Sequence, residues 1–286
     1  MPNMRILKGG AKAPQVLAVT SGKGGVGKTL TTVNLAMAAR RQGKSVLIFD
    51  GDMGLANVDI VLGLKSRYNI RDVLDGHAML KDILVKHPLG IDLIPSGSGI
   101  ASLTRLSHVQ KQQIIDQISQ LDQAYDLVLI DTGAGIAENV THFCKAADLT
   151  LVVTTPEPHA ITDAYALIKV LAEDHGVKSL YLLINQTRSD GEGLKIMTRI
   201  AEVAMRFLGV RVQFAGHVPF DHQVTKSIML RRAASEESTH TLAGQAWAQS
   251  ARRLFGGHET TRVHNDVQEL WHSLLWQQPS RAEGVS

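Results

Sequence analysis

Short apolar runs alternate along most of this chain with longer stretches in which apolar residues recur every three or four positions. A short run rich in Val, Leu and Ile predicts a buried strand, whereas the longer spacing is typical of an amphipathic helix. The predicted strands cover residues 16–20, 46–49, 91–95, 126–131, 149–155, 180–185 and 212–219. The predicted helices cover residues 29–41, 104–121, 136–147, 161–175, 192–208 and 239–255. This alternation indicates an α/β fold with a doubly wound, mostly parallel sheet and helices on both faces.

The pattern also divides the chain into segments. Residues 15–255 carry the alternation and predict a single domain, preceded by a flexible N-terminal tail at 1–14. Residues 256–263 (GGHETTRV) are typical of a linker. A last amphipathic helix is predicted at 264–278, and residues 279–286 form a tail.

Composition narrows the class of protein. The chain has 286 residues, 44% of them hydrophobic, and a formal net charge of +3, so no broad nucleic-acid-binding surface is implied. Cys144 is the single cysteine, which excludes an intrachain disulfide and fits a reducing cytoplasm. Since no stretch is apolar enough to span a bilayer, we expect a cytoplasmic protein.

The sharpest chemical signal is the run GKGGVGKT at residues 22–29, which has the phosphate-loop spacing G-x-x-x-x-G-K-[ST]. It lies between a predicted strand and a predicted helix, as this motif requires. In such a loop backbone N–H groups surround phosphates, the final lysine reaches the β and γ oxygens, and the hydroxyl binds Mg²⁺. The sequence therefore predicts binding of ATP or ADP with Mg²⁺. The predicted nucleotide-binding residues are Gly22, Lys23, Gly24, Gly25, Val26, Gly27, Lys28 and Thr29.

Acidic residues end two of the predicted strands, where ligands bind in folds of this class. Asp131 follows the run LVLI, as expected of a carboxylate that holds Mg²⁺ through water. Asp50 and Asp52 follow the second strand, and one of them could orient the attacking water while the other supports Mg²⁺ or the loop. The alternative is that these aspartates only form turns.

Two further strand ends suggest recognition of the base. Asn185 closes a predicted strand, and its amide can both donate to and accept from a purine edge. Pro219 closes the last strand and could flank the base, an assignment that rests more on family resemblance than on spacing.

A phosphate loop needs one lysine, yet Lys23 provides a second. In this respect the loop resembles the deviant motif of the MinD/ParA ATPases, whose extra lysine follows the first glycine. The resemblance extends over residues 15–255 and implies a P-loop ATPase that forms a homodimer on ATP. It implies that Lys23 contacts the phosphates of the other subunit, so Lys23, Lys28 and Asp52 become the expected catalytic residues. It also places Asp52 on the hydrolytic water and Thr29, Asp52 and Asp131 around Mg²⁺.

Three segments look most like the flagellar-number regulators called FlhG, FleN or YlxH, namely residues 50–64 (DGDMGLANVDIVLGL), 127–136 (LVLIDTGAGI) and 152–171 (VVTTPEPHAITDAYALIKVL). That branch implies control of flagellar number and placement. Its implied partners are an FlhF-like GTPase, C-ring components and a flagellar master transcription activator. The alternatives are a MinD-type ATPase that positions cell division and a DNA-partition ATPase of ParA type. We do not expect direct DNA binding, because only two arginine pairs suggest it.

Two features depart from the branch. The DQAxxLR segment by which some members stimulate their GTPase partner is absent from the N-terminal residues, which puts that activity in doubt. The C-terminal helix presents Val267, Leu270, Trp271, Leu274 and Leu275 on one face but carries no Lys or Arg between 265 and 278. It therefore predicts either a peripheral membrane contact, on the inner face of the cytoplasmic membrane or at the cell pole, or packing on its own domain or on a protein partner.

Overall fold

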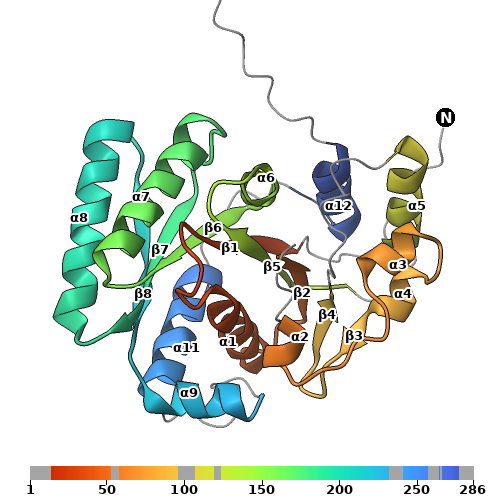
Figure 1. Ribbon diagram of the computed structural model, residues 1–286, viewed down its shortest axis with the longest axis horizontal. Coiled ribbons are helices and arrows are strands. Elements are labelled where there is room, and N and C mark those ends of the chain that lie inside the picture. Colours follow the sequence, from red (N-terminus) through yellow and green to blue (C-terminus); the bar gives the residue numbers. More distant parts are fainter. Residues whose placement is uncertain are drawn as a thin grey trace, which may run out of the picture.

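A computed structural model describes residues 14–52, 58–95, 107–118, 124–231, 241–256, 264 and 266–276. Its centre is an eight-stranded sheet in the order β3-β4-β2-β5-β1-β6-β7-β8 (Figure 1). The strands are β1 (Gln15–Ser21), β2 (Val46–Gly51), β3 (Val85–Lys86), β4 (Ile91–Ile94), β5 (Leu127–Ala134), β6 (Leu149–Thr154), β7 (Leu180–Thr187) and β8 (Val212–Pro219). All pairings are parallel except that of β3 with β4.

Helices cover both faces of the sheet (Figure 1). The helices are α1 (Lys28–Arg41), α2 (Val58–Val61), α3 (Ile70–Leu74), α4 (Leu80–Ile83), α5 (His108–Ile118), α6 (Glu138–Ala146), α7 (Pro158–Glu173), α8 (Asp190–Leu208), α9 (His222–Met229), α11 (Leu242–Phe255) and α12 (Val267–Trp276). Because successive strand residues point to opposite faces, the core divides into two clusters. One joins the sheet to α1, α2 and α11, and the other joins it to α3 to α8 and α12.

The predicted doubly wound α/β fold is confirmed, and every predicted strand and long helix is present. The predictions missed β3, α2, α3, α4 and α9, which are too short to show a clear period. Helix α7 begins at Pro158, three residues before the prediction, because proline fits the first turn of a helix. The tail at 1–13, the linker at 257–263 and the tail at 279–286 lie outside the described residues.

The strand order creates one natural binding position. Strand β1 lies between β5 and β6, so the chain turns to one side of β1 for β2 and to the other for β7 and β8. At such a switch point the loops after the strands separate and leave a crevice at the carboxyl edge of the sheet. The phosphate-loop motif follows β1 and therefore lies at this crevice.

Helix α12 packs on its own domain. Its residues Leu270, Trp271, Leu274 and Leu275 are buried in the core cluster beside α5 and α6. The Trp271 ring meets Phe49 of β2 edge to face at a centroid distance of 4.9 Å. The self-packing alternative is thus realised in this structure, and the predicted apolar face is the buried one. None of the described helices is long and apolar enough to cross a membrane.

Candidate functional site

The loop between β1 and α1 is built to receive an anion. Gly27 stands at the N-cap of α1 with a positive φ of 92° and supplies no side-chain cap to the first N–H groups of the helix. Those donors have no partner within a helix and, together with the helix dipole, favour phosphate. Gly25 has a positive φ of 82° as well, a backbone region that L-residues avoid. The Ser21 hydroxyl donates to the Lys23 carbonyl at 2.7 Å and fixes the start of the loop.

Two glycines allow close approach of neighbouring elements. A Cβ on Gly22 would lie 2.2 Å from the backbone of Asp163 in α7, so only glycine lets the loop and α7 meet. A Cβ on Gly27 would lie 2.3 Å from the side-chain amide of Asn185. Gly22 is therefore required for packing, and Gly27 is required both for packing and for its backbone conformation.

Asp131 lies at the centre of a hydrogen-bond network below the loop. Its Oδ2 accepts from the Thr29 hydroxyl at 2.7 Å, and its Oδ1 accepts from the Thr32 hydroxyl at 2.8 Å. Burial raises the pKa of Asp131 to about 6, against the opposing effects of the nearby Lys28 charge and of both hydroxyls. A hydroxyl and a carboxylate oxygen in contact are ligands that Mg²⁺ prefers, so these two residues fit the predicted metal site.

Asp50 and Asp52 extend this acidic region from the next strand. Asp50 pairs with Asp131 across β2 and β5. Its burial, with the Asp131 charge as the second cause, raises the pKa of Asp50 to about 7. The Asp50 carboxylate accepts from the backbone N–H of Asp52 at 3.1 Å and from that of Val58 at 3.4 Å, so it joins the end of β2 to the start of α2. Asp52 is only half-buried, and its Oδ1 lies 3.8 Å from where a Cβ on Gly133 would be.

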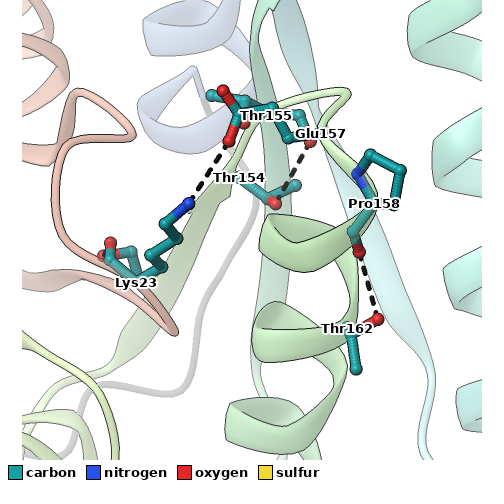
Figure 2. Close-up of polar contacts among 7 residues, drawn as sticks. Lys23, Thr154, Thr155, Glu157, Pro158 and Thr162 are labelled. Atoms are coloured by element: carbon teal, nitrogen blue, oxygen red, sulfur yellow. Dashed lines mark hydrogen bonds and ion pairs between the residues drawn. The ribbon is translucent and has the colours of Figure 1, made fainter.

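Lys23 points away from the loop toward α7. Its Nζ lies 3.4 Å from Oε2 of Glu157, the residue at the N-cap of α7 (Figure 2). Both side chains are well exposed, at 45% and 66%. An ion pair this exposed is weak, so Lys23 can leave it at low cost.

A cavity of about 750 Å³ opens at the carboxyl ends of β6, β7 and β8. Residues that line it include Thr155, Glu157, Gln186, Arg188, Pro219 and Phe220. The Thr155 hydroxyl is buried and has no hydrogen-bond partner in the described part of the chain. The cavity has the size of a small-molecule pocket, and its wall includes Pro219, one of the two residues predicted at the base.

The structure thus places the predicted residues of the loop, Asp52 and Asp131 at the crevice, whereas Pro219 lies in the wall of the cavity at the ends of β6, β7 and β8. Sequence reasoning missed Thr32 and Glu157. Thr32 lies one helical turn after Thr29, so the spacing of the two hydroxyls could have revealed it. Nothing local links Glu157 to Lys23, since their contact joins residues 134 apart in the chain.

Comparison with known proteins gives a consistent picture. A family model described as an AAA domain matches residues 14–179. The antiactivator FleN of Pseudomonas aeruginosa is 40% identical over 240 residues, covering 84% of this chain and 86% of FleN. The flagellum site-determining protein YlxH of Helicobacter pylori is 34% identical over 246 residues, covering 85% of this chain and 83% of YlxH.

Solved structures of similar proteins have the same fold as this chain. The MinD cell division protein of Aquifex aeolicus superimposes with a TM-score of 0.66 at 29% identity, covering 85% of this chain and 98% of MinD. The septum site-determining protein MinD of Pyrococcus horikoshii, solved in complex with Mg-ADP, gives a TM-score of 0.66 at 24% identity, covering 85% of this chain and 96% of that one.

Proposed function

This chain belongs to the MinD/ParA family of P-loop ATPases, and from that premise we propose that it is an ATP-driven dimerising switch that regulates flagellar number and placement. The observation that carries the proposal is the crevice itself. A phosphate loop, the Thr29–Asp131 pair and the extra lysine at the loop converge there in a chain 40% identical to FleN.

The described residues divide the chemistry of ATP hydrolysis among them. The loop N–H groups and Lys28 hold the phosphates, and Thr29 and Asp131 would hold Mg²⁺. When bound, the ion neutralises charge that develops on the β and γ oxygens. Asp52 reaches the crevice directly after the end of β2 and is less buried than Asp50 or Asp131. We assign it the role of orienting the attacking water and accepting its proton.

Lys23 gives the switch its dependence on a second copy. Its side chain is directed toward α7 and away from its own loop. From this position the Lys23 ammonium group can leave Glu157 and contact the phosphates bound by a partner protomer. A cation supplied in this way would act as an arginine finger does, so that hydrolysis waits for dimerisation.

The dimer is tested by sedimentation of Lys23→Ala with ATP. We expect the variant to bind ATP as a monomer and to form no ATP-dependent dimer. A variant that still dimerises as the unaltered chain does would remove Lys23 from the switch.

The flagellar role rests on the similarity to FleN and YlxH. Within it we propose an FlhF-like GTPase, C-ring components or a master transcription activator as partners. Deleting the gene should change the number or position of flagella. Unaltered flagella together with minicells would instead favour the second candidate, a MinD-type positioner of cell division. The fold shared with Aquifex MinD supports this candidate.

A peripheral membrane contact through α12 would require this helix to leave its own domain, because its apolar face is buried there. Liposome flotation with and without ATP tests this. Binding that depends on ATP and is lost in Leu274→Asp supports the anchor, and absence of binding by the unaltered chain contradicts it.

A further inference from the structure

Thr32 carries a buried hydroxyl to which the proposed chemistry assigns no role. It lies within α1, one helical turn after Thr29, and its side chain is fully buried. Its hydroxyl donates to Oδ1 of Asp131 at 2.8 Å and also lies 3.1 Å from the carbonyl oxygen of Lys28. A hydroxyl has only one proton to donate, and a carboxylate is the stronger acceptor. The main contact of Thr32 is therefore the bond to Asp131, 99 residues away in the chain.

The Asp131 carboxylate is held at both of its oxygens. The Thr29 hydroxyl donates to Oδ2 at 2.7 Å, whereas the Thr32 hydroxyl donates to Oδ1. The terminal torsion of an aspartate is broad, so a single bond at Oδ2 would leave the carboxylate free to turn. A bond at each oxygen fixes its plane. Because Thr29 is half-buried and Thr32 is fully buried, the oxygen that Thr29 contacts is the one nearer the start of α1.

Thr31 shows that burial of a threonine in α1 does not by itself provide this contact. Thr31 is fully buried as well, yet its hydroxyl has no hydrogen-bond partner among the described residues. Successive residues of a helix point about 100° apart, which directs Thr31 and Thr32 to different neighbours. The two residues thus share their chemistry, their helix and their burial, and only Thr32 reaches the carboxylate.

We propose that Thr32 is a positioning residue for the metal site. By fixing Oδ1 of Asp131 it keeps Oδ2 together with the Thr29 hydroxyl, the pair of oxygens that would hold Mg²⁺. The inference rests on the proposed function, because it concerns the ion of the proposed ATPase. Thr32 itself contacts neither the ion nor the nucleotide and acts through Asp131. Replacing a residue that orients a metal ligand typically weakens metal binding about 10- to 100-fold.

The test measures ADP affinity by calorimetry at a series of free Mg²⁺ concentrations, beginning with excess EDTA. ADP is not hydrolysed in the proposed reaction, so the readout does not depend on activity. Thr32→Val keeps the shape of the side chain and removes the hydroxyl, so ADP affinity in EDTA should be unchanged. The Mg²⁺ concentration that gives half of the gain in ADP affinity, the Mg²⁺ midpoint, should rise about 10- to 100-fold. An unchanged midpoint overturns the proposal, as does an equal loss of affinity with and without Mg²⁺.

Two comparisons isolate the hydroxyl. Thr32→Ser retains it and should bring the Mg²⁺ midpoint back toward that of the unaltered chain, whereas Thr32→Ala should not. Because these two variants differ by one hydroxyl, they decide the question if Thr32→Val does not fold. Thr31→Val is the matched control, since it removes a hydroxyl without a described partner from the same helix, and it should leave the midpoint unchanged. Equal midpoints in the Ser and Ala variants, or equal shifts in Thr31→Val and Thr32→Val, contradict the proposal.

The same measurements separate this inference from the proposed function. If the unaltered chain does not bind ADP, or binds it equally well in EDTA and in Mg²⁺, the proposed nucleotide and metal site fails and the role of Thr32 fails with it. If the unaltered chain shows the gain with Mg²⁺ and Thr32→Val has the same midpoint, only the role of Thr32 fails.

Discussion

The ion pair between Lys23 and Glu157 yields a quantitative prediction. If Lys23 must leave Glu157 to reach the partner's phosphates, removing the Glu157 charge should favour the ATP dimer. The substitution Glu157→Gln keeps the size of the side chain and deletes its charge.

The magnitude follows from exposure. The two side chains are 45% and 66% exposed, and exposed ion pairs contribute about 0.2–1 kcal/mol. Forming one dimer breaks two such pairs, which corresponds to about 0.4–2 kcal/mol, or a dimer dissociation constant lowered about 2- to 30-fold. The gain should shrink as salt is added, because exposed charges are screened.

The assay is sedimentation equilibrium with a non-hydrolysable ATP analogue at low and high salt. Glu173→Gln is the control, because it breaks the pair of Lys169 with Glu173, which joins similarly exposed side chains 3.9 Å apart in the same helix. That change should leave the dimer constant unaltered. A weaker dimer in Glu157→Gln, or an equal gain in both variants, would refute the view that Glu157 holds Lys23 back.

Four further predictions follow from the site and the core. Lys28→Ala should abolish ATP binding by calorimetry, because it removes the buried cation of the loop, and retained affinity would contradict the phosphate site. Asp52→Ala should still bind ATP and dimerise but release phosphate about 10²–10⁴-fold more slowly, the usual contribution of a general base; undiminished turnover would remove Asp52 from catalysis. Without Mg²⁺ the melting temperature should fall as the pH rises from 5 to 8. Burial raises the pKa of Asp50 to about 7, so in this range the folded state holds a proton that the unfolded state has lost, and stability decreases as that proton is released. Asp50→Asn should flatten this dependence, and an unchanged slope would locate its cause elsewhere. Trp271→Ala should lower the free energy of unfolding by about 3–5 kcal/mol in chemical denaturation, since the ring is fully buried, and a change below about 1 kcal/mol would show that α12 adds little to the fold.

Much of the fold could be predicted because its long elements carry strong periods. The strands around β1 are continuous apolar runs, and α8 and α11 show clear helical spacing. The region from α2 to β4 was predicted least well, since its elements span only a few residues and are defined by their packing.

The candidate site also has features that the sequence predicts and features that it does not. The loop and Asp131 have fixed positions relative to strand ends, so spacing alone indicates them. The contacts of Asn185 with Val26 and of Lys23 with Glu157 join residues 159 and 134 apart in the chain. No local pattern encodes such pairs, and the prediction of Asn185 as a site residue did not include its contact with the loop.

The docking of α12 on β2 has a thermodynamic consequence. Trp271 packs on Phe49, which immediately precedes Asp50, and Phe49 in turn packs on Phe143 at 5.6 Å. The same aromatic ring of Phe143 lies 3.1 Å from where a Cβ on Gly51 would be. The C-terminal helix therefore packs on the strand that carries Asp50 and is followed by Asp52. Linkage is reciprocal: whatever factor a bound nucleotide applies to the docking of α12, docking applies to the affinity for that nucleotide. If a bound nucleotide loosens the docking of α12, a molecule that captures the free helix must therefore raise the nucleotide affinity of the crevice without touching it.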